Sequence, residues 1–272
     1  MQRKKWFELH DHRFFPRFLR DLFTDGLESI WNQTHTYRVV VPRLQAAMEE
    51  AGTQRIVDLC SGGGGPWIRL RQELTKNGGA PVSVSLTDKY PNAEAIARTQ
   101  AAGEMSFHPK PVNAMQIPDE MKGFRTIFSS FHHFGPTEAR AILADAASQR
   151  QGIAVFDAAQ CKTLTLLAIV AVPFINLYAT PGIRPFRWSR LVWTYLLPVV
   201  PLTLFIDGIL SCLRSYSPAD LHELTEGLGG DEYHWEIGEE PSGPLQITYL
   251  IGRPRTYSEP EQMLAASAVS VT

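Results

Sequence analysis

The chain has 272 residues, of which 44% are hydrophobic and 20% are charged. This length suits one large domain or one domain with an insertion, and the composition excludes a disordered chain and a coiled coil. The net charge of −2 argues against a general nucleic-acid binder, and three scattered cysteines argue against a disulfide framework, so a reducing cytosol is the expected setting.

Positive charge is concentrated in two stretches of the chain. Residues 1–20 and residues 161–214 each carry a net charge of +4, so the remainder carries −10. The first stretch lacks the apolar run of a signal peptide, because Glu8 and Asp11 interrupt it. Two basic and apolar stretches on an acidic body are typical of a protein that touches an anionic membrane surface.

The spacing of apolar residues predicts strands alternating with helices after two N-terminal helices. Helices are expected at 14–31, 36–51, 66–77, 92–102 and 136–149, with a later one that begins at Ser217 as its cap. Strands are expected at 55–59, 82–88, 105–112, 124–131, 152–157, 233–237 and 245–251. This alternation is typical of an α/β fold with a doubly wound, mostly parallel sheet. The last two strands lack a helix between them, so one of them is expected to run antiparallel.

A glycine-rich loop at 61–65 follows the first strand and leads into a helix. Its glycines let the backbone approach a ligand, and such sheets bind ligands at the carboxyl ends of their strands. The loop lacks the Gly-Lys-Ser/Thr of a phosphate-cradling loop, and Trp67 replaces the last glycine of a dinucleotide-binding loop. Asp58, before the glycines, suits a cofactor with a cationic amino-acid portion. Asp88 ends the second strand, where it is placed to bind ribose hydroxyls. An ordinary loop of a sheet protein is the alternative.

The chain resembles the class I S-adenosylmethionine-dependent methyltransferases over residues 50–160 and 215–252. Four segments carry the resemblance in the family's order and spacing: 57–65, 86–88, 112–114 with Pro118, and 128–134. The resemblance implies a Rossmann-like, doubly wound seven-stranded sheet that binds S-adenosyl-L-methionine and releases S-adenosyl-L-homocysteine. The sequence departs from the family at Cys60, which stands at the first glycine of the loop, and at Asn113, which stands at the usual adenine-contacting acid.

The same resemblance implies which residues contact the cofactor. They are Asp58, Cys60, Gly62 and Gly64 at the methionine portion, Asp88 at the ribose, Asn113 and Ala114 at the adenine, Ser130 and Phe131 beside the sulfonium, and the adjoining Ser61 and Lys89.

Two histidines, His132 and His133, follow the fourth strand near the expected position of the methyl group. Methyl transfer mainly requires positioning and desolvation of the reactants, and a general base helps where the acceptor is a hydroxyl or a protonated amine. One of the two histidines is expected to take that proton, because histidine titrates near neutral pH. The alternative is that one packs on the sheet or caps the next helix while the other is solvated.

No metal site is expected from the sequence. The run His10-Asp11-His12 offers too few converging ligands, so a solvated and mobile start is the favoured interpretation. Asp207 interrupts an apolar run. It is expected to act as a cap, to pair with Arg214 seven residues later, or to face the substrate.

Residues 161–214 form an apolar insertion after the fifth strand. The runs 163–180 and 191–206 carry no charge, but both are shorter than the about 20 residues of a spanning helix, and prolines interrupt them. Three arginines lie between them, namely Arg184, Arg187 and Arg190. A spanning hairpin would carry these arginines across the bilayer, so a helical hairpin in one leaflet or in the interface is expected, with the arginines at lipid phosphates. The alternative is a hydrophobic cap buried on the sheet or in a dimer.

The sequence therefore predicts four regions: an N-terminal helical lid (1–51), a cofactor-binding domain (52–160 and 215–252), the apolar insertion (161–214) and a loose tail (253–272). The expected function is methyl transfer to a lipid or another hydrophobic small molecule, with the lid and the insertion covering the acceptor site. The expected location is the cytoplasm, peripheral or monotopic at the inner face of the membrane. No oligomeric state is predicted.

Three other functions are weighed against this one. A soluble small-molecule methyltransferase would use the insertion as a buried lid, and a non-catalytic cofactor-binding scaffold would use it to anchor a partner. Nucleic-acid methylation is disfavoured by the acidic body and by the lack of an Asn-Pro-Pro-Tyr-like segment after the fourth strand.

Overall fold

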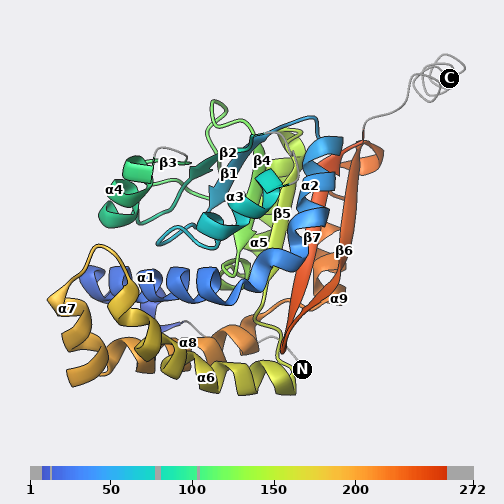
Figure 1. Ribbon diagram of the computed structural model, residues 1–272. Helices are drawn as coiled ribbons and strands as arrows, with labels where there is room; N and C mark the ends of the chain where they lie inside the picture. Colours follow the sequence, from blue (N-terminus) through green and yellow to red (C-terminus); the bar gives the residue numbers. More distant parts are fainter. Residues whose placement is uncertain (1–7, 13, 77–80, 103–104, 256–272) are drawn as a thin grey trace, which may run out of the picture.

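The computed structural model describes residues 8–12, 14–76, 81–102 and 105–255 (Figure 1). The basic residues before Glu8, the expected helix end at 77–79 and most of the expected loose tail lie outside these described residues.

Seven strands form one sheet in the order β3-β2-β1-β4-β5-β7-β6. Their bounds are β1 (Arg55–Leu59), β2 (Ser83–Leu86), β3 (Met105–Phe107), β4 (Phe124–Phe128), β5 (Ile153–Asp157), β6 (Tyr233–Ser242) and β7 (Leu245–Pro254). The first five strands are parallel, and β7 runs antiparallel to both β5 and β6. This topology confirms the predicted Rossmann-like α/β fold and identifies β7 as the antiparallel strand.

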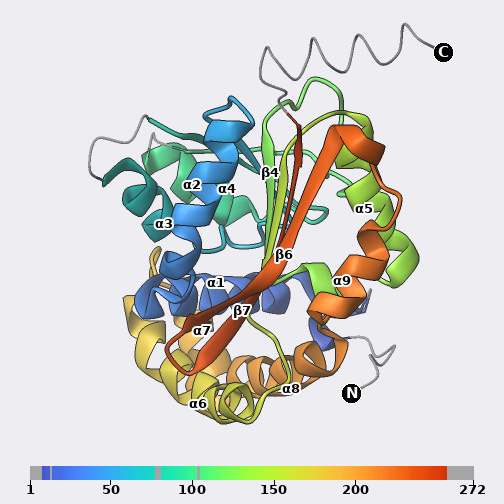
Figure 2. The same cartoon turned by 90° about the vertical axis from the view of Figure 1, so that its right-hand side faces the viewer.

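Helices cover both faces of the sheet (Figure 2). Their bounds are α2 (Val41–Glu50), α3 (Trp67–Thr75), α4 (Ala93–Ala102), α5 (Pro136–Ser148) and α9 (Pro218–Thr225). Apolar side chains of α2 and α3 pack on one face, and those of α5 and α9 pack on the other. The predicted cap of α9 is confirmed, because Ser217 Oγ accepts a hydrogen bond from the Asp220 N–H.

The N-terminal helices differ in their bounds from the sequence-based expectation. The first, α1 (Arg17–Thr34), begins after Pro16, whose backbone is extended, and ends at His35 in the left-handed conformation. The second is divided, because residues 36–40 form a 3-10 helix and α2 begins only at Val41, with a proline in its first turn.

The apolar insertion is helical, as predicted. It consists mainly of α6 (Thr163–Ala179), α7 (Trp188–Leu191), a π-helical turn (Val192–Leu196) and α8 (Val199–Arg214). These elements join α1 in a layer at the end of the sheet toward which β4 and β5 run (Figure 1). Apolar side chains of α1 and α8 form the core of this layer. The sheet therefore ends against a helical layer built from two segments, α1 and residues 163–214, that are far apart in the sequence.

One segment of this layer, Thr163–Gly182, is long and apolar enough to cross a membrane. Of its most apolar stretch of 18 residues, 28% is buried inside the protein. The elements Trp188–Leu196 and Val199–Arg214 pass the same criterion only together, and they are bent by 66°. Length and composition alone are weak grounds for a span, because core helices of soluble proteins share them.

Candidate functional site

The ends of β1 and β4 carry two non-glycine residues in the left-handed backbone region. Cys60 has φ = 59° and Ser129 has φ = 44°. Such conformations cost roughly 1–3 kcal/mol each and tend to occur at functional sites. Ser130 Oγ lies 3.5 Å from the Cys60 carbonyl oxygen, which links the two turns. Cys60 thus adopts a conformation that glycine, the usual residue of the family at this position, adopts without strain.

Asp88, at the end of β2, connects the glycine loop with the segment after β3. One of its carboxylate oxygens accepts a hydrogen bond from the Gly62 N–H at 2.8 Å, and the other accepts one from the Tyr90 N–H at 2.7 Å. The Val112 N–H donates to the Asp88 carbonyl at 2.9 Å, which holds Asn113 beside the same strand end. Burial raises the pKa of Asp88. Three predicted cofactor segments therefore meet at one edge of the sheet.

Asp58 lies beneath the glycine loop. Its carboxylate accepts hydrogen bonds from Ser61 Oγ and from Thr126 Oγ1, both at 2.6 Å. Burial raises its pKa to about 6, although these hydrogen bonds oppose the shift. Asp58 thus links the loop to β4 through hydrogen bonds. Its contact with the methionine portion of the cofactor stays a prediction.

The other predicted cofactor residues differ in their exposure. Lys89 and Asn113 are exposed, Cys60, Gly62, Asp88 and Ser130 are half-buried, and Ser61, Gly64, Ala114 and Phe131 are buried. Phe131 is 1% exposed, and its ring packs against Tyr216 in the core. It therefore lies behind the surface at which a sulfonium would be bound, and a direct contact with the cofactor stays a prediction.

Helix α1 lies directly against the glycine loop. A Cβ atom on Gly63 would lie 2.9 Å from the carbonyl oxygen of Thr24, and one on Gly64 would lie 3.3 Å from Glu28 Oε1. The glycines therefore also permit close packing of α1. Sequence reasoning missed Thr24 and Glu28, because nothing local indicates which residues of a helix meet a distant loop.

Two hollows of the described residues lie away from the glycine loop, against α2. One has a volume of about 490 Å³ and is lined by Arg43 and Glu236, among others. The second, of about 610 Å³, lies between α2 and the start of β1.

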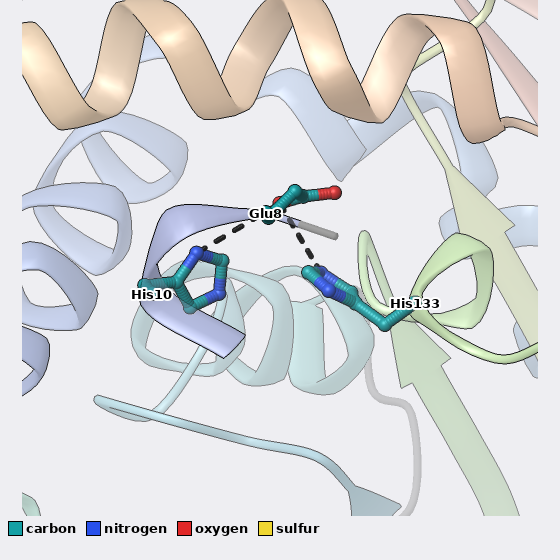
Figure 3. Close-up of side chains that lie close together, drawn as sticks. All are labelled: Glu8, His10 and His133. Atoms are coloured by element: carbon teal, nitrogen blue, oxygen red, sulfur yellow. Dashed lines mark ion pairs between the residues drawn. The ribbon is translucent and has the colours of Figure 1, made fainter. Parts of the chain in front are cut away.

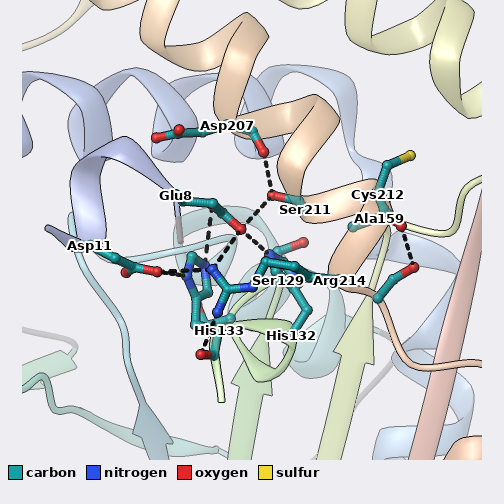
Figure 4. Close-up of polar contacts among 12 residues, drawn as sticks. Glu8, Asp11, Ser129, His132, His133, Ala159, Asp207, Ser211, Cys212 and Arg214 are labelled. Atoms are coloured by element: carbon teal, nitrogen blue, oxygen red, sulfur yellow. Dashed lines mark hydrogen bonds and ion pairs between the residues drawn. The ribbon is translucent and has the colours of Figure 1, made fainter. Parts of the chain in front are cut away.

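A cluster of charged side chains surrounds the two predicted catalytic histidines (Figure 4). His132 Nδ1 lies 2.5 Å from Asp157 Oδ2, and its Nε2 lies 3.3 Å from Glu8 Oε1. His133 Nδ1 lies 2.6 Å from Asp11 Oδ2. The structure thus brings both histidines together with acids that the sequence did not connect to them.

The two histidines are not equivalent as bases. Burial alone would lower the pKa of His132, but Asp157 and Glu8 outweigh it and raise that pKa to about 10. Burial likewise opposes ionisation of Glu8, yet His133 and His132 lower its pKa to about 2. His132 is therefore protonated at neutral pH, so only His133 stays a candidate for the predicted base.

Helix α8 packs against the cluster and contributes Asp207 and Arg214 to it. Asp207 accepts hydrogen bonds from the backbone N–H groups of Leu9, at 2.7 Å, and His10, at 3.2 Å. Arg214 Nη1 lies 3.3 Å from Asp11 Oδ2. Of the three alternatives for Asp207, the described residues do not show the pairing with Arg214, because each of the two side chains meets the N-terminal segment instead.

The expectation that His10, Asp11 and His12 are solvated is also wrong for two of these three residues. His10 and Asp11 are half-buried and paired with side chains of the cluster, and only His12 is exposed. The contacts come from residues that are about 120–200 positions away, so no local pattern reveals them.

One predicted lipid contact is contradicted as well. Arg190 is 2% exposed, and its guanidinium lies 2.9 Å from Asp25 Oδ2 of α1. It also donates to the carbonyl oxygens of Ile183 and Pro185. Of the three arginines in the connector, only Arg184 and Arg187 are exposed.

No protein-family model and no curated protein matches the chain in sequence. Solved structures are similar to it only at low identity and with TM-scores below 0.5. Human N-acetylserotonin methyltransferase with S-adenosylmethionine is 13% identical over 89% of this chain and 57% of that chain, with a TM-score of 0.47. An O-methyltransferase of neocarzinostatin biosynthesis, solved with S-adenosylmethionine and 2-hydroxy-5-methyl naphthoic acid, is 16% identical over 88% of this chain and 62% of that chain, with a TM-score of 0.46.

A protein assigned as a zinc-dependent alcohol dehydrogenase from Rhodobacter sphaeroides is equally similar. It is 15% identical over 86% of this chain and 98% of that chain, with a TM-score of 0.46. The chain spans only 57–62% of the length of the two methyltransferases above. Likenesses at this distance concern the fold alone. The arrangement of strand order, glycine loop and Asp88 is the one that the resemblance to class I methyltransferases implies.

Proposed function

We propose that the protein is an S-adenosylmethionine-dependent methyltransferase that acts on a hydrophobic small molecule, with a lipid as the favoured acceptor. One observation carries the methyl-transfer proposal. The glycine loop after β1 and the acid after β2 are joined by the hydrogen bond from the Gly62 N–H to Asp88, at the edge of the sheet where α/β proteins bind ligands.

The residues at this edge fit the cofactor. Each oxygen of the Asp88 carboxylate accepts one backbone hydrogen bond, which leaves lone pairs for ribose hydroxyls. The exposed Asn113 lies beside Asp88, where the adenine is expected. The methionine portion is assigned to the loop 60–64. Helix α1 packs directly against this loop, so α1 is proposed as one wall of the cofactor site.

The acceptor is assigned to the helical layer below this edge. The layer carries many exposed apolar side chains, among them Tyr178 (85% exposed), Trp188 (75%) and Leu196 (75%). Exposed apolar surface of this extent is typical of membrane or partner contacts. With Arg184 and Arg187 on the same connector, it suits the surface of an anionic bilayer, from which an apolar acceptor reaches the site.

His133 is the proposed base where the acceptor carries a proton. Its ring lies between Asp11 and Glu8, so a carboxylate holds one ring nitrogen and stabilises the charge that proton uptake creates. His132, protonated between Asp157 and Glu8, positions this ring by stacking on it at a centroid distance of 4.5 Å.

Two alternatives make different predictions. A soluble methyltransferase with a buried lid would hide the apolar side chains of α6, whereas Leu167 (62%) and Phe174 (67%) are exposed. A cofactor-binding scaffold would bind S-adenosylmethionine without turning it over.

The test is a transfer assay with methyl-labelled S-adenosylmethionine and, separately, a lipid extract and an aqueous extract of the source cells. We expect label in the lipid fraction, reduced about tenfold or more by Asp88→Ala, because that change removes a charged hydrogen-bonding group. The exposed Asp119→Ala is the matched control and should leave transfer unchanged.

The three other outcomes are equally informative. Label only in the aqueous fraction would overturn the lipid acceptor and turn the insertion into a lid. Cofactor binding without transfer to either fraction would favour the scaffold. Absence of cofactor binding would refute the methyltransferase altogether.

A further inference from the structure

Three side chains with metal-ligating atoms meet at the carboxyl end of β4 (Figure 3). Glu8 and His10 come from the N-terminal segment, and His133 comes from the 3-10 turn η4 (Phe131–His133). One ligand atom of each lies within 4.8 Å of those of the other two. Glu8 Oε2 lies 3.7 Å from His133 Nε2 and 3.8 Å from His10 Nδ1.

These separations are close to those of a coordinated ion. Bonds of about 2.1 Å to nitrogen and oxygen place two ligand atoms of a tetrahedral ion roughly 3.4 Å apart. Each of the two pairs therefore needs to approach by only a few tenths of an ångström, which side-chain rotations supply.

A neighbouring carboxylate orients His133, and another lies at the nitrogen of His10 that faces Glu8. Asp11 Oδ2 lies 2.6 Å from His133 Nδ1, so the Nε2 of that ring is turned toward Glu8. A carboxylate on the second ring nitrogen is the usual support of a metal-ligating histidine, because it fixes the ring and its tautomer. Asp207 Oδ2 lies 2.8 Å from His10 Nδ1, so a further carboxylate is within reach as a fourth ligand.

The charges of the cluster favour a cation. Among the described residues, four carboxylates, those of Glu8, Asp11, Asp157 and Asp207, face the three histidines. Two cations oppose them, the guanidinium of Arg214 and the protonated His132. Buried carboxylates are costly unless positive charge compensates them. Arg214 lies beside Glu8 Oε1, at 3.7 Å, whereas His10 and His133 face Oε2. The second oxygen is therefore available to an ion without contact with the guanidinium.

We propose that Glu8, His10 and His133 bind a divalent transition-metal ion, a site that the sequence did not indicate. Two imidazoles and a carboxylate suit Zn²⁺, Fe²⁺, Mn²⁺ or Co²⁺ rather than Mg²⁺ or Ca²⁺, which prefer oxygen ligands alone. The ion would tie the N-terminal segment to the end of β4. If the proposed function holds, the ion would replace His133 in activating an acceptor hydroxyl, because a metal ion lowers the pKa of a bound hydroxyl and its binding would occupy the His133 Nε2 that the proposed base uses.

The test is a binding titration of the full-length protein after removal of metal with a chelator. Co²⁺ reports through its visible absorption, and Zn²⁺ is followed by calorimetry. We expect one ion per chain and an affinity at least tenfold lower in Glu8→Gln and in His133→Gln. Asp11→Asn should weaken binding about 10–100-fold through the orientation of His133. His12→Gln is the control, because this exposed histidine lies in the same segment but outside the cluster.

Circular dichroism confirms that each variant is folded. Folded wild-type protein that takes up no ion overturns the proposal, and so does binding that is unchanged in both Glu8→Gln and His133→Gln. Binding of S-adenosylmethionine is measured in parallel. Metal uptake without cofactor binding supports the metal site and refutes the methyltransferase, and the reverse result refutes only the metal site.

Discussion

At the scale of single residues, Asp58 links the conformation of the glycine loop to pH. It is 1% exposed, and its carboxylate is held by two hydroxyl groups, those of Ser61 and Thr126. Since burial raises its pKa to about 6 from its ordinary value of 3.8, the folded protein binds a proton more tightly than the unfolded chain does. Stability from this group is fully present below about pH 3.8 and is lost as the pH rises through 6.

We expect Asp58→Asn to remove this pH dependence. Between pH 4 and 7 the wild type should lose roughly 2–3 kcal/mol of unfolding free energy relative to the variant, since one pKa unit corresponds to about 1.4 kcal/mol. The measurement is urea unfolding of both proteins at several pH values. Other carboxylates titrate in both proteins, so the difference between the two curves isolates Asp58. Parallel curves would contradict the assignment.

Gly63 is the residue at which the contact between α1 and the glycine loop is tightest. We expect Gly63→Ala to destabilise the protein by about 1–3 kcal/mol, because the new methyl group would meet backbone atoms of a helix, which cannot yield as a side chain does. Gly182→Ala is the matched control, since a Cβ there has no neighbour within 4 Å, and its effect should stay within about 0.5 kcal/mol. Guanidinium unfolding compares the two, and equal effects would show that α1 is not held against the loop.

At the scale of elements, the ion pair of Arg190 with Asp25 joins α7 to α1. Both side chains are buried, at 3% and 1% exposure. We expect Arg190→Met to destabilise the protein by about 3–5 kcal/mol, because it removes the guanidinium that balances the charge of the buried Asp25 carboxylate. Arg187→Met, on the same connector but exposed, should change stability by less than about 0.5 kcal/mol.

A double variant distinguishes the pair from simple loss of packing. If the two charges interact, Arg190→Met combined with Asp25→Asn destabilises the protein by less than the sum of the single changes. Thermal unfolding of the four proteins gives the coupling energy, and strict additivity would argue against the pair.

Most elements of the sheet could be predicted from the sequence, because each depends on a local pattern. The segment Arg55–Leu59 has the apolar run of a buried strand, and Ser217 with Pro218 has the pattern of a helix start. The third strand is shorter than expected, Met105–Phe107, because only its first residues pair with β2. The glycine loop and Asp88 were predicted by the same kind of local signal, strengthened by the family resemblance.

The charged cluster could not be predicted, because it depends on contacts between distant segments. Glu8 looks like any acid in a polar N-terminal stretch, and its role appears only when α8 and η4 close around it. The seven-residue step from Asp207 to Arg214 allowed a pair on one helix face, but tertiary contacts with His10 and Asp11 prevailed.

At the scale of the whole molecule, the acidic sheet domain and the basic apolar layer are spatially separate. The layer of α1, α6, α7 and α8 lies at one end of the sheet (Figure 1), and many of its apolar side chains are exposed. A protein with this distribution of charge and apolar surface would approach an anionic bilayer with the insertion first. The proposed acceptor site would then lie between the membrane and the cofactor.

Vesicle flotation tests this orientation. We expect the protein to float with vesicles that contain phosphatidylserine. A triple variant that combines Phe174→Ser, Trp188→Ser and Leu196→Ser should no longer float, because these three side chains are 67%, 75% and 75% exposed. Arg184→Gln with Arg187→Gln should weaken binding about 30-fold on anionic vesicles, at about 1 kcal/mol for each arginine, and should have little effect on neutral ones. Ile68→Ser is the control, since this side chain is 46% exposed but lies on α3, away from the layer. The orientation is contradicted if the triple variant floats as the wild type does, or if Ile68→Ser weakens flotation as much. The layer would then not be the surface that binds the membrane, and the acceptor would be sought in the aqueous phase.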